Sequence, residues 1–361
     1  MALSPTIERG VQALSRVAII EARAQVNNGE VVLYHLAEGV AEDADRAALD
    51  RLKGEGLDLD FDFSRKDGHS YVTLNAGARP KTHRVSPLHI YLFLATVLTT
   101  LAAGAFMQGY DVFRQPWTII LGWPFSLTLM AILGTHESGH YVYARRHHVD
   151  VSLPYFIPVP PPLTIIGTFG AFIKIRGRIP NRLALLEIGA AGPIAGFLVA
   201  VPALFLGLHL STVVPVEGAG FILGDSLLLK FASALMFPAL GPTEDILLHP
   251  VAFAGWIGML ITMLNLLPLA QLDGGHIAYA LLGDRQAWLG RAVFLALIPM
   301  GIFLSPNWLF WGLLILILMR TVKHPPIHDV NRPLTPHELR IGIACLVIFI
   351  LCFIPVPFTT S

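Results

Sequence analysis

One short stretch of the chain has the residue types of a hydrolytic metal site. It contains His136, Glu137 and His140 in the pattern H-E-x-x-H, near the end of an apolar run. On a helix, positions i and i+4 point the same way, so the two histidines can offer imidazole nitrogens to one ion. Glu137 would hold a water molecule beside it. Zinc bound by imidazoles acidifies its water and supplies a nucleophile at neutral pH.

The setting of this motif supports a functional interpretation. A pattern this short also arises by chance. Ionisable side chains at membrane depth cost free energy, however, and by default mark functional sites. Catalytic zinc normally takes one more protein ligand than the two histidines supply. A third ligand must therefore come from another part of the chain.

Asp273 is the first candidate for this third ligand. It lies in an apolar segment that Pro268 breaks, and the expected topology returns it to the same membrane face as His140. A carboxylate oxygen suits zinc and leaves a position open for water. The alternative is that Asp273 caps a helix. Glu187, near the start of another apolar segment, is the rival ligand.

Two further polar residues lie near Asp273 in the sequence. The amide of Asn265 could hydrogen-bond the oxyanion of a tetrahedral intermediate, or it could satisfy backbone groups freed by Pro268. His276 would either support the metal ligands from behind or be a packed polar residue.

The composition indicates a polytopic membrane protein. Of 361 residues, 54% are hydrophobic and only 14% are charged, which is too apolar for an ordinary soluble enzyme. The formal net charge is zero, so nothing suggests a nucleic-acid partner. Cys345 and Cys352 share one apolar segment, where a disulfide framework or a thiolate metal site is not expected.

Residues 1–85 are predicted to form a soluble α+β domain, and residues 86–361 the membrane domain. In the first, helices are expected where apolar residues recur with helical period or where a polar helix-forming run ends at a glycine, and strands where apolar and polar residues alternate. An Asp67-Gly68 turn predicts a hairpin. The expected helices are Ile7–Ala24 and Glu42–Lys53, and the expected strands are Val31–Tyr34, Leu57–Phe63 and Tyr71–Leu74.

The membrane domain is predicted to be an all-α bundle of about seven spans. The expected spans are His89–Tyr110, Trp117–His140, Leu183–Leu208, Val251–Leu267, Trp288–Leu304, Trp308–Arg320 and Leu339–Phe353. Arg145 and Arg146 follow the second span, so the positive-inside rule places that end in the cytoplasm. The basic linker 79–84 then also lies inside, which makes the N-terminal domain cytoplasmic. His147 and His148 are interpreted as interfacial residues rather than ligands.

The segment Val151–Ile179 contains too many prolines to span a membrane. Within it, Gly167–Ile175 has the pattern of a strand with glycines. We expect a re-entrant β-hairpin beside the metal, whose edge could pair with an extended peptide. A cytoplasmic surface hairpin is the alternative. The residues predicted to contact the peptide are Gly167, Thr168, Phe169 and Gly170.

These motifs together resemble those of the site-2 proteases, which are intramembrane zinc metalloproteases. The matching stretches are H-E-S-G-H and N-L-L-P-L-A-Q-L-D-G-G-H. G-T-F-G-A-F-I-K-I, R-I-P-N-R and A-A-G-P-I-A-G are also similar to the branch with the chloroplast ethylene-dependent gravitropism-deficient proteins and their bacterial relatives. The resemblance covers roughly residues 85–320. No inserted PDZ domain or C-terminal nucleotide-sensing module is apparent.

The resemblance implies a site and a substrate. His136, His140 and Asp273 would bind Zn²⁺, Glu137 would act as general base and acid, and Asn265 would assist the transition state. The strand Gly167–Ile175 would present a transmembrane protein substrate, unwound within the lipid bilayer.

The sequence thus predicts an intramembrane zinc endopeptidase. The alternative is a membrane metal transporter or a non-proteolytic scaffold that uses the histidines as an ion path. Transporters often contain internal repeats, and the H-E-x-x-H segment is not repeated. The expected location is the bacterial cytoplasmic membrane, because the N-terminal residues lack the pattern of a transit or signal peptide.

Overall fold

The protein is described here from a computed structural model. The structure describes most residues from 86 onward. Before residue 86 it describes four strands and a few further residues. The described ranges are 8–9, 11–12, 15, 18–26, 29–36, 59–66, 69–76, 86–177, 179–215, 221–319, 321, 324, 327 and 333–360. The chain divides into two compact units, Met1–Thr82 and His83–Ser361.

The N-terminal unit contains a four-stranded antiparallel sheet in the order β1-β2-β4-β3. The strands are β1 (Ala18–Val26), β2 (Gly29–Leu36), β3 (Leu59–Lys66) and β4 (His69–Ala76). The predicted strand at 31–34 and the pairing of the two later strands are confirmed. The predicted helix Glu42–Lys53 and turn Asp67-Gly68 lie outside the described residues.

The helix predicted at Ile7–Ala24 is wrong over its second half, which belongs to β1. The reason is visible in the sequence. From Ile20 to Val26 apolar and polar residues alternate strictly, which is the period of a strand rather than of a helix. Pairing with β2 runs from Ala18 to Val26, with a shift in register between Ile20 and Ala22.

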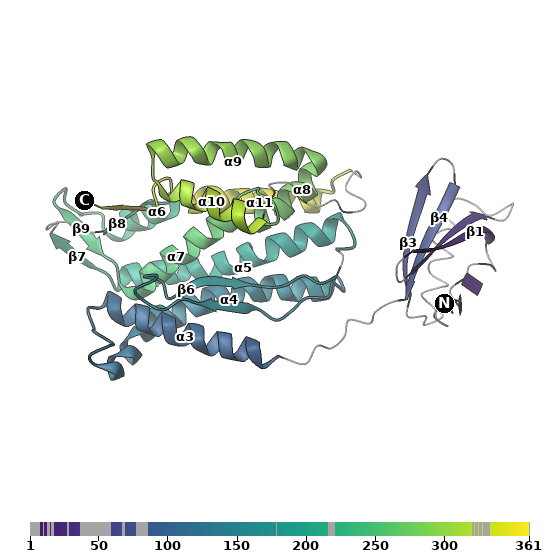
Figure 1. The fold of residues 1–361 in the computed structure, drawn as a ribbon. Coiled ribbons are helices and arrows are strands. Elements are labelled where there is room, and N and C mark those ends of the chain that lie inside the picture. The colour runs from purple at the N-terminus through teal and green to yellow at the C-terminus, as the bar shows by residue number, and fades with distance from the viewer. Residues whose placement is uncertain are drawn as a thin grey trace. The chain divides into compact units, whose positions relative to one another are not determined.

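The second unit is built mainly from helices (Figure 1). They are α3 (Pro87–Met107), η1 (Pro116–Gly122), α4 (Trp123–Arg146), α5 (Arg182–His209), α6 (Leu227–Met236), α7 (Pro250–Asn265), α8 (Asp273–Leu282), η2 (Gly283–Arg285), α9 (Gln286–Phe303), α10 (Asn307–Met319) and α11 (Pro336–Cys352). Several begin with a side-chain cap: Ser86 precedes α3, Asn181 precedes α5, and Thr335 forms a capping box with Glu338 at α11.

Four helical segments of the described chain are long and apolar enough to cross a membrane. They are Pro87–Met107, Pro116–Arg146, Arg182–His209 and Asp273–Phe303. Each overlaps one of the predicted spans. Shorter apolar helices include Pro250–Asn265 and Asn307–Ile317, at two more of the predicted positions.

The helices α3, α4, α5 and α7 pack side by side, with α4 against α5 and α5 against α7 along much of their lengths (Figure 1). Large side chains such as Leu129, Leu185, Leu204 and Trp256 are fully buried between them. Many outward-facing side chains of the same bundle are also apolar, for example Leu98. A surface of this kind suits lipid rather than water.

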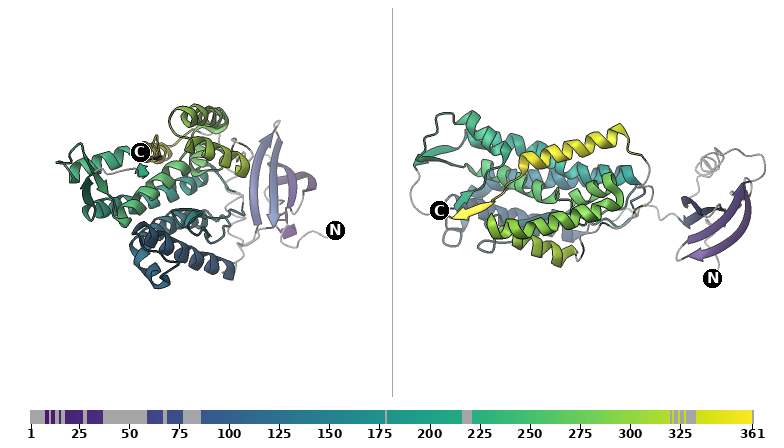
Figure 2. Two further views of the ribbon diagram at one scale, coloured as in Figure 1. Left: turned by 60° about the vertical axis from the view of Figure 1, so that its left-hand side comes forward. Right: turned by 90° about the horizontal axis from the view of Figure 1, so that it is seen from above.

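Short antiparallel strand pairs complete this unit. β7 (Thr212–Pro215) pairs with β9 (Glu244–Leu247), and β8 (Phe221–Leu223) pairs with β10 (Phe358–Thr360), at one end of the bundle (Figure 2). Beside α3 and α4, β5 (Tyr155–Pro158) pairs with β6 (Thr168–Phe172). This last pair contains the hairpin predicted around residues 167–175, although the partner strand β5 was not predicted.

Candidate metal centre

Two helices bring three ligand atoms to one point. His136 and His140 lie one turn apart on α4 and are buried, and Asp273 is the first residue of α8. The Nε2 atoms of the histidines are 3.1 Å apart. Each lies 3.3 Å from Oδ2 of Asp273. The three atoms thus have the spacing expected for one face of a tetrahedron, and Asp273 comes from a part of the sequence far from the two histidines.

This triangle fits a zinc ion. Tetrahedral zinc with bonds of about 2.0–2.1 Å separates its ligand atoms by about 3.3 Å, close to the distances found. Two imidazoles and one carboxylate are also the donor types that zinc takes in hydrolases. Within the described residues, this trio is the group of histidine, cysteine and acidic side chains that could hold a metal ion.

A backbone carbonyl fixes the orientation of one imidazole. Nδ1 of His140 lies 2.7 Å from the carbonyl oxygen of Ile188 in α5, and both are buried. Because that carbonyl can only accept, Nδ1 carries the proton and Nε2 keeps its lone pair for a metal. The helix α5 therefore sets the tautomer of a ligand on α4.

Glycines of α5 make room for the ligands. A Cβ added at Gly192 would lie 2.0 Å from Nε2 of His140, and one at Gly196 would lie 3.1 Å from Nδ1 of His136. At Gly189 it would lie 3.3 Å from the backbone oxygen of Asp273. In the sequence these glycines appeared only in or beside the matching stretch A-A-G-P-I-A-G. In the structure Gly192 and Gly196 each make room for a candidate ligand, and Gly189 makes room for the first turn of α8, with the Cβ of His276 nearest at 2.9 Å.

Replacing Gly192 with alanine should weaken metal binding about 10- to 100-fold, the usual effect of disturbing the surroundings of a ligand. The new methyl group would occupy the position of the His140 ring, so the imidazole must move. Zinc competition with a chromophoric chelator measures the change. Gly134→Ala is the matched control, because a Cβ at that glycine of α4 meets nothing within 4 Å. Equal zinc affinity in both variants would contradict this account of the packing.

Asp273 does not act as a helix cap. The N-cap position of α8 is Leu272, without a side-chain capping bond, and the Asp273 carboxylate points to the two histidines. The following glycines pack the start of α8 against the broken segment before it. A Cβ at Gly274 would lie 2.0 Å from the carbonyl oxygen of Leu266, and one at Gly275 would lie 2.3 Å from that of Ala270.

Glu137 and Asn265 lie beside this triangle. Glu137 is only 5% exposed, and the backbone of Ile173, directly after β6, hydrogen-bonds its carboxylate. Asn265 ends α7, and its Nδ2 lies 3.4 Å from Nε2 of His136. The structure thus brings the predicted general base and the predicted oxyanion donor to the candidate metal ligands.

The predicted substrate-contacting residues form β6 and the turn before it. Gly167 has φ +84°, and a Cβ there would lie 2.6 Å from the carbonyl oxygen of Thr99 in α3. Thr168 is buried; its hydroxyl donates to Ile157 and accepts from the backbone N–H of Gly170. Phe169 is 70% exposed. The four residues therefore form a supported strand with one large apolar side chain outside.

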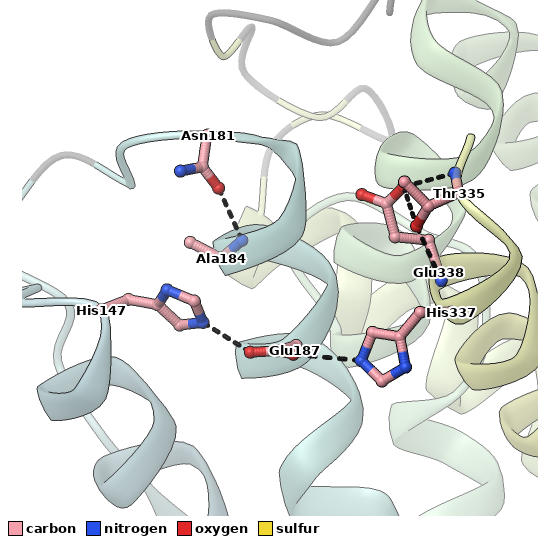
Figure 3. Close-up of polar contacts among 7 residues, drawn as sticks. All are labelled: His147, Asn181, Ala184, Glu187, Thr335, His337 and Glu338. Carbon is pink, nitrogen blue, oxygen red and sulfur yellow. Dashed lines mark hydrogen bonds and ion pairs between the residues drawn. The ribbon is translucent and has the colours of Figure 1, made fainter. Parts of the chain in front are cut away.

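Glu187 has partners that exclude it from the triangle in this structure. Its Oε2 lies 2.6 Å from Nε2 of His147, at the end of α4, and its Oε1 lies 3.4 Å from Nε2 of His337 in α11 (Figure 3). The rival assignment of Glu187 as third ligand is therefore not supported. Sequence reasoning also missed the contact between His147 and Glu187, because no local sequence pattern indicates a partner 40 residues away.

His276 is packed against another histidine. Its Nδ1 lies 2.7 Å from Nε2 of His324, which is buried and stacks on Tyr279. The backbone N–H of His324 donates to Gln286, and Gln286 donates to the carbonyl of Pro268. The partly buried side chain of His276 therefore has the packed, hydrogen-bonded surroundings of one sequence interpretation, and a role in supporting the metal ligands stays a prediction.

Comparison with known proteins shows relatives of this chain and its family. The sequence profile of Peptidase family M50 matches residues 124–304. "Probable zinc metalloprotease EGY2, chloroplastic" of Arabidopsis thaliana is 30% identical over 243 residues, covering 66% of this chain and 42% of that protein. "Probable zinc metalloprotease EGY1, chloroplastic" of the same plant is 34% identical over 243 residues, covering 64% and 43%.

A third relative, "Probable zinc metallopeptidase EGY3, chloroplastic" of Arabidopsis thaliana, is 27% identical over 289 residues, with 72% of this chain and 48% of that protein covered. The chain spans less than half the length of these curated relatives. No solved structure matches it. The matched region contains His136, Asp273 and the helices between them, and the chain belongs to Peptidase family M50.

Proposed function

We propose that this protein is an intramembrane zinc endopeptidase that cleaves peptide bonds in or near the transmembrane helices of membrane proteins. The observation that carries the proposal is the triangle of His136, His140 and Asp273, with Glu137 beside it, inside a bundle of apolar helices. Membership of Peptidase family M50 and relatives named as zinc metalloproteases support the same chemistry. They do not favour the transporter or scaffold alternative.

The residues take the following roles. His136, His140 and Asp273 hold zinc, which when bound polarises a carbonyl and lowers the pKa of water. Glu137 takes a proton from the attacking water and gives one to the leaving amine. The Ile173 backbone holds its carboxylate in place.

The substrate is proposed to bind as a strand. An amide carbonyl within an intact helix is shielded, so the substrate helix must unwind locally before its peptide bond can react. An unwound segment needs partners for its backbone groups within the membrane. Residues Gly167, Thr168, Phe169 and Gly170 lie in or beside β6, next to α4, where an added strand would run near Glu137.

The membrane arrangement is part of the proposal. Three shorter crossings, at α7, α10 and α11, would bring the spans to about seven. Arg145 and Arg146 support a cytoplasmic end of α4. Residues 1–85 would then be a cytoplasmic domain and residues 86–361 the protease domain. We place the protein in a bacterial cytoplasmic membrane, although the relatives named above are chloroplastic.

Removal of the metal tests this function. The purified protein in detergent is incubated with a model transmembrane substrate before and after treatment with a zinc chelator. Cleavage should stop when zinc is removed and return when zinc is added in slight excess. Cleavage that persists without bound zinc would contradict the proposal, and so would zinc-loaded protein that cleaves none of a panel of transmembrane substrates.

Replacing Asn265 with alanine should lower kcat by about 10²–10³, the effect of removing one oxyanion donor. Bound zinc and KM should change little, because the amide acts mainly on the transition state. Initial rates over a range of substrate concentrations separate the two constants. An unchanged kcat would show that Asn265 serves only to end α7.

A further inference from the structure

Glu187 of α5 makes contacts to two other helices, α4 and α11 (Figure 3). It lies in the second turn of α5, and each carboxylate oxygen has its own histidine partner. His147 is the C-cap of α4, and His337 lies in the first turn of α11. The side chains of His147 and Glu187 are only 17% and 14% exposed, whereas that of His337 is 57% exposed.

The contact with His147 belongs to the same interface that supports the metal ligands. The helices α4 and α5 run antiparallel: His136 lies against Gly196, and His140 lies against Gly192. Continuing toward the end of α4, His147 meets Glu187. These three contacts define the position of α4 along α5. The contact between His147 and Glu187 is the one nearest the C-terminal end of α4.

The residue after Glu187 makes the bond that orients a ligand. The carbonyl of Ile188 accepts from Nδ1 of His140 at 2.7 Å. Sliding α4 along α5 by even a fraction of a turn would break this bond and press the His140 ring against the backbone of Gly192. The pair of Glu187 and His147 resists such a slide, because its hydrogen bond is 2.6 Å long and largely excluded from water.

The third partner extends the contact to α11. That helix also packs on α8, where Leu281 fills the space beside Gly342. The Glu187 carboxylate therefore contacts α4, which carries both candidate histidine ligands. It also contacts α11, which packs on α8, the helix that begins with Asp273.

We propose that Glu187 is a positioning residue for the metal site. It holds α4, α5 and α11 in register through His147 and His337, and so fixes His140 for metal binding without touching the metal. This inference rests on the proposed zinc site.

The test measures the metal site directly, independently of proteolysis. Zinc dissociation into an excess of chelator is followed for each variant, and Co²⁺ is substituted for zinc so that its visible absorption reports ligand geometry. Glu187→Ala should release zinc about 10- to 100-fold faster, as loss of a residue that supports a ligand commonly does. Its Co²⁺ spectrum should also shift.

Conservative and partner variants separate positioning from general stability. Glu187→Gln should remain within about threefold of the wild type, because an amide can still accept from one imidazole and donate to the other. His147→Ala should behave like Glu187→Ala, and the double variant should be no worse than either single one. His337→Ala should have a smaller effect, because its contact is longer and more exposed.

Two matched controls lie away from this contact. His209→Ala changes an exposed histidine in the last turn of α5, and Glu244→Ala changes an exposed glutamate in β9. Both should keep the wild-type rate of zinc release. If Glu187→Ala does not fold, His147→Ala and Glu187→Gln decide the question, because both leave a polar or charged partner in place.

The result that overturns the proposal is a folded Glu187→Ala or His147→Ala protein with the wild-type zinc release rate and Co²⁺ spectrum. That result would leave the protease function standing if the wild type cleaves. Conversely, a wild type that binds zinc but cleaves nothing would contradict the protease function while the release rates still test the positioning role.

Discussion

Replacing Asp273 with alanine is expected to remove bound zinc and cleavage together. Its Oδ2 lies 3.3 Å from Nε2 of both His136 and His140, so it is the only described acidic side chain that completes their triangle. Structural zinc sites bind with about 10–16 kcal/mol, and one ligand of four accounts for about 2.5–4 kcal/mol. The zinc affinity should therefore fall about 10²- to 10³-fold.

Metal content after dialysis and competition with a chelator measure this change. The matched control is Asp284→Ala, which removes an exposed aspartate in η2, just after α8. It should keep the zinc affinity of the wild type. Glu187→Ala provides a second comparison, because it should release zinc faster yet still bind it. Full zinc content and normal cleavage in Asp273→Ala would show that the third ligand lies elsewhere.

Replacing Glu137 with glutamine should stop cleavage while zinc stays bound. A general base contributes about 10²–10⁴-fold to a rate, and an amide cannot take the proton of the attacking water. The substitution preserves the local structure, because the glutamine oxygen can still accept the hydrogen bond from the Ile173 backbone. The prediction is checked by cleavage rates and zinc content measured on the same preparation.

The opposite pattern would be equally informative. If Glu137→Gln lost its zinc, the effect on cleavage would no longer report on proton transfer, and Glu137 would have to be regarded as part of the metal site. If it kept both zinc and cleavage, another residue must act as the base. Ser138→Ala, at the exposed neighbouring position on α4, is the matched control and should retain both.

The candidate site was largely predictable because its chemistry is local. The spacing of His136 and His140 places both on one helix face wherever that helix lies. Asp273 stood out because a carboxylate in a helix interrupted by Pro268 has few other uses at membrane depth. These arguments need residue types and helical geometry, and they do not need the packing of the bundle.

Other features depend on contacts that no local pattern contains. His147 was interpreted as an interfacial residue and Glu187 as a rival ligand, because their pairing depends on the register of α4 on α5. In the N-terminal unit the error had another cause. The alternation from Ile20 to Val26 already favoured a strand over a helix, and the pairing of β1 with β2 is consistent with it.

The position of Asp273 has a thermodynamic consequence. The helices α5 and α7 lie between His140 and Asp273 in the sequence. An ion bound by His136, His140 and Asp273 therefore closes a very long loop of chain. Closing a loop between distant segments removes freedom from the unfolded ensemble, and an ion that binds only the folded state shifts the equilibrium toward it. The metal would then act as a cross-link as well as a catalyst. The occupancy of the metal site and the free energy of unfolding of the helix bundle would depend on each other.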